Sequence, residues 1–186
     1  MSRVIVYGNG KSRQKWNVNE KLDDVVTWGC NRIFNDIKVD NLVAMDYHIQ
    51  HLIHESGYAK NNKCWFKSWN VIDEDDMIEN IDFPKEWSSG ATAVYLACQQ
   101  GATEIYLMGF DISDDPKDNV YEREQNEYRP EIANYSFRLD WAEELKTVFT
   151  EFKKVKFIWA EPASYMNEVL DIPNTNESNA VINKSV

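Results

Sequence analysis

Short apolar runs that stop at turn-forming or polar residues are the feature that most constrains the fold of this chain. Residues 3–7, 25–28, 41–45 and 104–108 are rich in β-branched and large apolar side chains. Such runs are typical of strands that are buried on both faces. Because helix-patterned segments and loops separate them, we predict an α/β domain with a Rossmann-like, mainly parallel sheet and helices on both faces.

Three segments have the apolar spacing of amphipathic helices. They begin near Asp46, at Ser88 and near Ile132. The second is the clearest, because its small residues suit a helix that lies close to a sheet. Gly57 and Gly101 follow the first two segments, at positions where glycine commonly ends a helix.

The remaining segments complete the predicted domain. Residues 63–66 and 155–159 are expected to form two more strands, and the acidic stretch 73–86 is interpreted as a surface excursion. We expect a single domain over residues 1–172, because a chain of 186 residues supports one core and rarely two. Residues 173–186 are rich in Asn and Ser and are expected to form a flexible tail.

Composition and charge exclude several classes of protein. Hydrophobic residues make up 43% of the chain and the formal net charge is −11. We therefore expect a folded, soluble protein without a basic surface for nucleic acid or for an anionic membrane. Cys30, Cys64 and Cys98 lack C-x-x-C spacing and predict reduced thiols. With no signal peptide expected at the N-terminus, these features indicate a cytoplasmic protein.

Five of the seven glycines fall at or just after the ends of predicted strands or at the start of the clearest helix. They are Gly8, Gly10, Gly29, Gly90 and Gly109. In open α/β sheets, ligands bind outside the carboxyl ends of the strands, and glycine lets a backbone approach a ligand closely. Each glycine alone is most simply a turn residue, but their concentration at one predicted edge indicates a binding site.

Polar residues accompany these glycines at the same predicted edge. Asn9 and Ser12 flank Gly10, Asn31 and Asp46 follow two strands, and Ser89 lies at the start of the clearest helix. Amides and carboxylates can pair with ribose hydroxyls or a base edge, and a helix N-terminus favours a phosphate. Helix capping is an equally simple interpretation of several of these residues, so both stay open.

Five short motifs follow one another in a fixed order along roughly residues 3–111. They are Gly8-Asn9-Gly10 with Ser12, Cys30-Asn31, Ser88-Ser89-Gly90, the strand 104–107, and Gly109-Phe110-Asp111. This succession resembles that of the bacterial sialyltransferases that use CMP-sialic acid. The resemblance implies a nucleotide-sugar-dependent glycosyltransferase with a CMP-sugar donor, a hydroxyl acceptor and no required cofactor.

The resemblance also implies which residues bind a small-molecule nucleotide or nucleotide sugar. Asp46 stands where the family has an Asn. Tyr121 would be one of the tyrosines that steady the leaving phosphate, with surface packing as its simpler interpretation. The implied nucleotide-binding residues are Gly8, Asn9, Gly10, Ser12, Asn31, Asp46, Ser89, Gly90, Asp111 and Tyr121.

The chain departs from this family at the catalytic base. The family places a His between the loop after residue 111 and the last helix, whereas this chain has no His after His54. Glu127, Glu131 or Asp140 could take its role, and nothing in the sequence selects one of them. A non-catalytic nucleotide-binding module is therefore an alternative function.

A metal-dependent phosphotransferase or hydrolase on the same fold is a further alternative. His48, His51 and His54 lie three residues apart on one predicted helix, and Asp114 and Asp115 lie in an acidic loop. Neighbouring histidines on a helix face can bind a divalent metal, and acids can hold Mg²⁺. An exposed polar helix face and a solvated loop are the simpler interpretations, so we predict no metal site.

Overall fold

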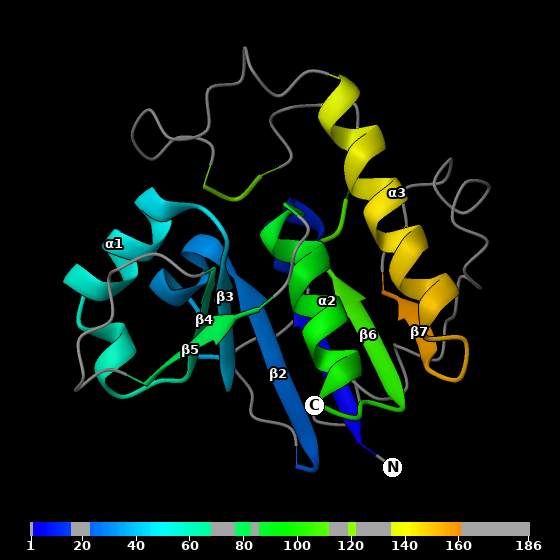
Figure 1. Cartoon of the computed structure of the whole chain (residues 1–186), viewed down its shortest axis with the longest axis horizontal. Coiled ribbons are helices and arrows are strands. Elements are labelled where there is room, and N and C mark those ends of the chain that lie inside the picture. Colours follow the sequence, from blue (N-terminus) through cyan, green and yellow to red (C-terminus); the bar gives the residue numbers. More distant parts are fainter. Residues whose placement is uncertain are drawn as a thin grey trace.

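The centre of the molecule is a parallel sheet of seven strands (Figure 1). The computed structural model describes residues 2–15, 23–67, 77–82, 86–111, 119–121 and 135–160. The strands are β1 (Arg3–Tyr7), β2 (Val25–Cys30), β3 (Asn41–Ala44), β4 (Cys64–Lys67), β5 (Ile78–Ile81), β6 (Glu104–Met108) and β7 (Lys156–Trp159). The predicted α/β class and the mainly parallel sheet are confirmed.

The strand order places β1 in the interior of the sheet. The order is β5-β4-β3-β2-β1-β6-β7, and every pairing is parallel. Arg3 on β1 pairs with Val25 on β2 and with Glu104 on β6. The order therefore reverses between β1 and β6, and the carboxyl edge at such a reversal is where open α/β sheets bind ligands.

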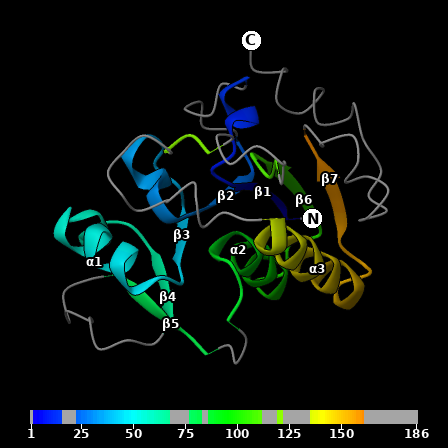
Figure 2. The same ribbon diagram turned by 90° about the horizontal axis from the view of Figure 1, so that it is seen from above.

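Helices cover both faces of this sheet, as the sequence predicts (Figures 1 and 2). α2 and α3 pack on one face, and α1 with the short 3-10 helices η2 and η3 packs on the other. The described helices are η1 (Lys11–Lys15), η2 (Asn31–Asn35), α1 (Tyr47–Glu55), η3 (Tyr58–Lys60), α2 (Ser89–Gln99) and α3 (Tyr135–Glu151).

Side chains that alternate along the strands build one hydrophobic core on each face of the sheet. In β1, Val4 and Val6 belong to the core under α2 and α3, whereas Ile5 and Tyr7 belong to the core under η2 and α1. α2 contributes a row of buried alanines to the first core. Their small side chains let this helix lie close to the strands.

Two strands differ from the expectation. Residues 78–81 form the edge strand β5 inside the stretch interpreted as a surface excursion. The pattern is weak because Glu79 and Asn80 are exposed at that edge. β2 continues through Gly29 to Cys30, so Gly29 lies within a strand and not after one. A Cβ on Gly29 would lie 2.7 Å from the Ile33 side chain, so this glycine serves the packing of η2 on the sheet.

The ends of α1 and α2 agree with the predicted glycine stops. Gly57 and Gly101 follow these helices with φ values of +73° and +87°, a conformation that favours glycine. No helix among the described residues is long and apolar enough to cross a membrane. The predicted tail, residues 173–186, lies outside the described residues.

Candidate functional site

The loops that follow β1 and β6 touch at the carboxyl edge of the sheet. The Gly8 amide donates to the Met108 carbonyl (2.7 Å), and the Gly10 amide donates to the Gly109 carbonyl (2.8 Å). A Cβ on Gly8 would lie 2.4 Å from the Gly109 carbonyl oxygen, and Gly109 has a φ of +70°. The two backbones can approach this closely because both positions are glycine.

Ser12 and Asp111, two predicted site residues, are brought together by this contact. The Ser12 amide donates to Asp111 Oδ2 at 2.9 Å, and the Ser12 hydroxyl donates to the other carboxylate oxygen. A Cβ on Gly10 would lie 2.5 Å from the same carboxylate. Asp111 therefore fixes the β1 loop (residues 8–13) against the loop after β6.

Asn9 connects the β1 loop to the end of β2. Its Nδ2 donates to the Cys30 carbonyl at 3.2 Å. Asn31, the next residue along the chain, has a φ of +52°, which Asn tolerates better than most residues. Asn9 Oδ1 is buried and has no hydrogen-bond partner among the described residues. A buried acceptor of this kind is a place for a donor from a ligand or a water molecule.

A short segment of residues 119–121 lies along the β1 loop. Asn119 forms an isolated antiparallel bridge with Gly10. The Val120 amide donates to the Asn9 carbonyl at 2.8 Å. The Tyr121 amide donates to the Asn119 side-chain oxygen at 2.9 Å. This 119–121 segment, which follows β6 in sequence, therefore continues the backbone pairing that the glycine loops begin.

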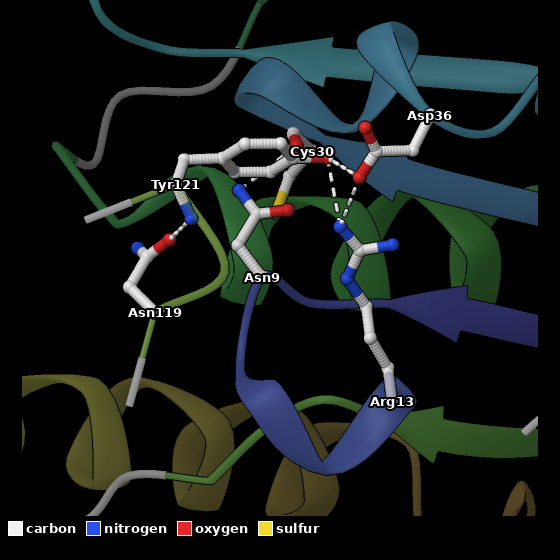
Figure 3. Close-up of polar contacts among 6 residues, drawn as sticks. All are labelled: Asn9, Arg13, Cys30, Asp36, Asn119 and Tyr121. Carbon is white, nitrogen blue, oxygen red and sulfur yellow. Dashed lines mark hydrogen bonds and ion pairs between the residues drawn. The ribbon is translucent and has the colours of Figure 1, made fainter. Parts of the chain in front are cut away.

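Tyr121, Arg13 and Asp36 form a hydrogen-bonded trio beside Asn9 (Figure 3). The Tyr121 hydroxyl donates to Asp36 Oδ2 (2.6 Å) and accepts from Arg13 Nη2 (2.7 Å). Arg13 Nη2 also pairs with Asp36 Oδ2 at 2.9 Å. Burial, and then the bond to Asp36, raises the pKa of the Tyr121 hydroxyl. Its proton is given to Asp36, so donating to a phosphate would require that bond to break.

A carboxylate of the chain occupies the N-terminus of α2. The Ser88 amide and hydroxyl both donate to Glu144 Oε2 on α3, at 3.0 and 2.6 Å. Ser88 also caps α2 by accepting from the Ala91 amide (3.3 Å). Burial raises the pKa of Glu144, against the opposing effect of the bonds from Ser88. Ser89 is buried, and its hydroxyl accepts from the Met45 amide at 3.0 Å, tying α2 to the end of β3.

Asp46 and Gly90 lie near this helix end. Asp46 holds the N-cap position of α1 without a side-chain capping bond. It is exposed overall, and the partial desolvation of its carboxylate raises its pKa. A Cβ on Gly90 would lie 3.3 Å from the Phe110 ring. The side-chain capping interpretation therefore fits Ser88 and does not fit Asp46.

The candidate metal and base residues make none of the hydrogen bonds described above, or fall outside the described residues. On α1, the His51 ring meets the Tyr47 ring edge to face, with ring centroids 4.2 Å apart. The described residues contain no group of three or more His, Cys, Asp or Glu placed to hold a metal ion. Asp140 is exposed on α3. The other candidate residues, Asp114, Asp115, Glu127 and Glu131, lie outside the described part of the chain.

Three residues of this region have no counterpart in the sequence-based prediction: Arg13, Asp36 and Glu144. Arg13 carries a buried charge, only 2% exposed, and Asp36 and Glu144 each bond to a residue far away in sequence. The strand order of the sheet brings each of these residues next to its partner. Nothing in the local sequence pattern identified them.

The fold is that of a Rossmann-like α/β protein. Its strand order reverses between β1 and β6, and sheets of this kind bind ligands at the carboxyl edge of that reversal. No family model and no curated protein matches the sequence. Among solved structures, the fold is that of bacterial sialyltransferases, and the predicted resemblance is confirmed at the level of the fold.

Two structures from Campylobacter jejuni illustrate this similarity. The sialyltransferase CstII, in complex with the substrate analogue CMP-3FNeuAc, has 18% sequence identity and a TM-score of 0.57, over 95% of this chain and 88% of that chain. The monofunctional alpha-2,3-sialyltransferase Cst-I has 15% identity and a TM-score of 0.60, over 92% and 80%. Identity this low makes the relationship one of fold.

Proposed function

We propose that this protein is a sialyltransferase-like glycosyltransferase that binds a CMP-sugar at the carboxyl edge between β1 and β6. The observation that carries the proposal is the assembly of Asn9, Ser12 and Asp111 at the reversal of strand order. This assembly occurs in a fold shared with a sialyltransferase solved with CMP-3FNeuAc. A small-molecule nucleotide sugar suits this edge, because its loops offer backbone and amide groups in place of a basic surface.

The proposed roles follow from the contacts of each residue. Gly8, Gly10 and Gly109 bring two backbones together where a nucleotide would lie. The Oδ1 of Asn9, which has no hydrogen-bond partner in the described part of the chain, accepts from a donor of the nucleoside. Ser12 and Asp111 hold the loop in shape, and Tyr121 contributes by keeping the 119–121 segment in place. Nucleotide-binding roles for Asn31, Asp46, Ser89 and Gly90 remain part of the proposal.

Transfer requires a proton acceptor as well as a donor site. In the proposed step, the acceptor hydroxyl oxygen bonds to the anomeric carbon while the bond from that carbon to the phosphate oxygen breaks. CMP leaves with the electron pair, and a base takes the hydroxyl proton. Of the described carboxylates of α3, we favour Glu144 over the exposed Asp140. Glu144 is bonded to the N-terminus of α2, and its raised pKa suits a base.

A cytoplasmic location is part of the proposal. It is supported by the three cysteines, which are buried as thiols in the structure. Free thiols are the usual state in a reducing compartment.

Thermal unfolding with and without nucleotides tests the proposed function. CMP, UMP, GMP and AMP would each be added in the presence of EDTA, because a ligand that binds only the folded state raises the melting temperature. We expect CMP to stabilise the chain and Ser12→Ala to reduce that shift. Ser56→Ala, which also removes a hydroxyl bonded to the chain, is the matched control. No shift with any nucleotide would overturn the proposal.

Turnover separates an enzyme from a binding module. CMP release from CMP-N-acetylneuraminic acid, with water or a sugar as acceptor, would be followed by chromatography. We expect release by the wild type and its loss in Glu144→Gln, with CMP binding retained. Binding of CMP without any release would favour the non-catalytic module.

A further inference from the structure

Arg13 carries a buried charge, and a buried guanidinium is costly unless an opposite charge and hydrogen bonds compensate it. Arg13 is 2% exposed, and its described polar contacts are Asp36 at 2.9 Å and the Tyr121 hydroxyl at 2.7 Å. Its guanidinium also lies 5.4 Å from the centre of the Tyr121 ring, over the ring face. The cation is thus held by one carboxylate and one tyrosine.

These three residues join three separate loops at the edge of the sheet. Arg13 lies on η1 after β1, Asp36 follows η2 after β2, and Tyr121 lies in the 119–121 segment after β6. Arg13 and Tyr121 are 108 residues apart in sequence. In Figure 3, Asn9 and Arg13 rise from the same loop toward Tyr121 and Cys30. The trio therefore lies where the predicted nucleotide loops converge.

The trio bears on the position of Asn9, because the 119–121 segment contacts this residue. Its side chain is held by the Cys30 carbonyl and its own carbonyl by the Val120 amide. Tyr121, the next residue, is anchored through its hydroxyl, which bonds to Asp36 and Arg13, while the Asn119–Gly10 bridge holds the segment on the other side of Val120. Losing that hydroxyl removes both bonds while leaving the Arg13–Asp36 pair intact.

We propose that Arg13, Asp36 and Tyr121 are positioning residues that hold the 119–121 segment against the β1 loop and so keep Asn9 and Gly10 in the nucleotide-binding conformation. None of the three needs to touch the nucleotide. The inference rests on the proposed function for its ligand and on the contacts above for its geometry. If the binding conformation were populated only a tenth of the time, apparent affinity would fall about tenfold.

The test uses Tyr121→Phe in the full chain, with Tyr58→Phe as the matched control. Tyr58 also bonds through its hydroxyl, to the backbone of Val39, but it packs against the core under η2 and α1. CMP affinity would be measured by titration calorimetry, and hydrogen exchange of the Val120 amide would be measured by NMR without ligand. We expect Tyr121→Phe to bind CMP about tenfold more weakly and to exchange Val120 faster. Tyr58→Phe should change neither.

Two further variants separate positioning from a general loss of stability. Asp36→Asn keeps an acceptor for Tyr121 and should retain more CMP affinity than Asp36→Ala. In an Asn9→Ala background, Tyr121→Phe should weaken CMP binding little further, because both changes act on the same group. An equal effect of Tyr121→Phe with and without Asn9 would overturn the inference.

The outcomes also separate this inference from the proposed function. A wild type that does not bind CMP overturns the proposed function. Unchanged CMP affinity in Tyr121→Phe, with the wild type binding normally, overturns the inference alone. Unchanged exchange at Val120 in Tyr121→Phe also overturns it, and this measurement does not depend on any ligand.

Discussion

Ser12 and Asp111 are 99 residues apart in sequence and are joined by two hydrogen bonds, one from the Ser12 amide and one from its hydroxyl. Both bonds end on one carboxylate, so a single side chain aligns the loops after β1 and β6. Hydrogen bonds to a charged acceptor are stronger than those between neutral groups. The shape of the proposed nucleotide edge therefore depends on Asp111.

Asp111→Ala is expected to lower the free energy of unfolding by about 1.5–3 kcal/mol, the usual worth of hydrogen bonds to a charged group. The loss should come with weaker CMP binding, because the β1 loop is no longer fixed. Urea unfolding and calorimetry would measure the two effects. Asp140→Ala, at an exposed position on α3, is the control and should change neither. Unchanged stability in Asp111→Ala would contradict the prediction.

Gly10→Ala should disrupt the same contact from the other side. The added Cβ would lie 2.5 Å from the Asp111 carboxylate and 2.6 Å from the Gly109 carbonyl oxygen. One of these neighbours must move, at a typical cost of about 1–3 kcal/mol for an overpacked site. Gly90→Ala is the comparison, because the nearest described side chain to its Cβ would be the Phe110 ring, at 3.3 Å. Urea unfolding should show the larger loss for Gly10→Ala.

Glu144 should make stability depend on pH in a defined direction. Its pKa is raised in the folded chain because burial disfavours the charge. The folded state therefore holds this proton more tightly than the unfolded state. The stability that this bound proton contributes is fully present below the ordinary Glu pKa. It is lost as the pH rises through the raised pKa of the folded chain.

Glu144→Gln removes that charge and keeps an acceptor for Ser88. Relative to the wild type, its stability should improve as the pH rises from 4 to 8. Urea unfolding at several pH values would measure the difference. A Gln variant that falls further behind the wild type at pH 8 would show that the carboxylate charge stabilises the helix end.

The cysteines should be inert to alkylation in the folded chain. Burial raises the pKa of both Cys30 and Cys98 to about 12, and Cys64 is fully buried. At pH 8, roughly one thiol in ten thousand with such a pKa is the reactive thiolate. Mass spectrometry after iodoacetamide treatment should find no label without urea and three labels with it. Labelling of the native chain would contradict this prediction.

Local sequence patterns were enough to predict most of the fold. Continuous apolar runs predicted the interior strands, since both of their faces are covered, and the small residues of α2 predicted its close packing. β5 was missed because an edge strand exposes residues such as Glu79 and Asn80 and loses the apolar pattern. Gly29 was placed after its strand because a glycine inside β2 has the same local appearance as a turn.

The candidate site was predictable only in part. Glycine and amide positions at strand ends follow from the pattern of the chain, and Ser12 and Asp111 were both among the predicted residues. The bonds that join Arg13, Asp36 and Tyr121 depend on the strand order, because they connect loops that follow three different strands. No local pattern encodes such a partnership. The same reason kept Glu144 out of the sequence-based prediction.

The register that pairs Arg3 with Glu104 has a consequence for how the protein is made. β1 is synthesised before its second neighbour, β6, and the four strands β2 to β5 lie between the two in sequence. Contacts between residues so distant in sequence slow folding, because a long loop must close before they form. A nascent chain that ends before β6 can build β1 and β2 but has no partner for Gly8 and Gly10. The proposed binding edge is therefore completed only after β6 has been synthesised, and until then the side of β1 that pairs with β6 stays without its partner strand.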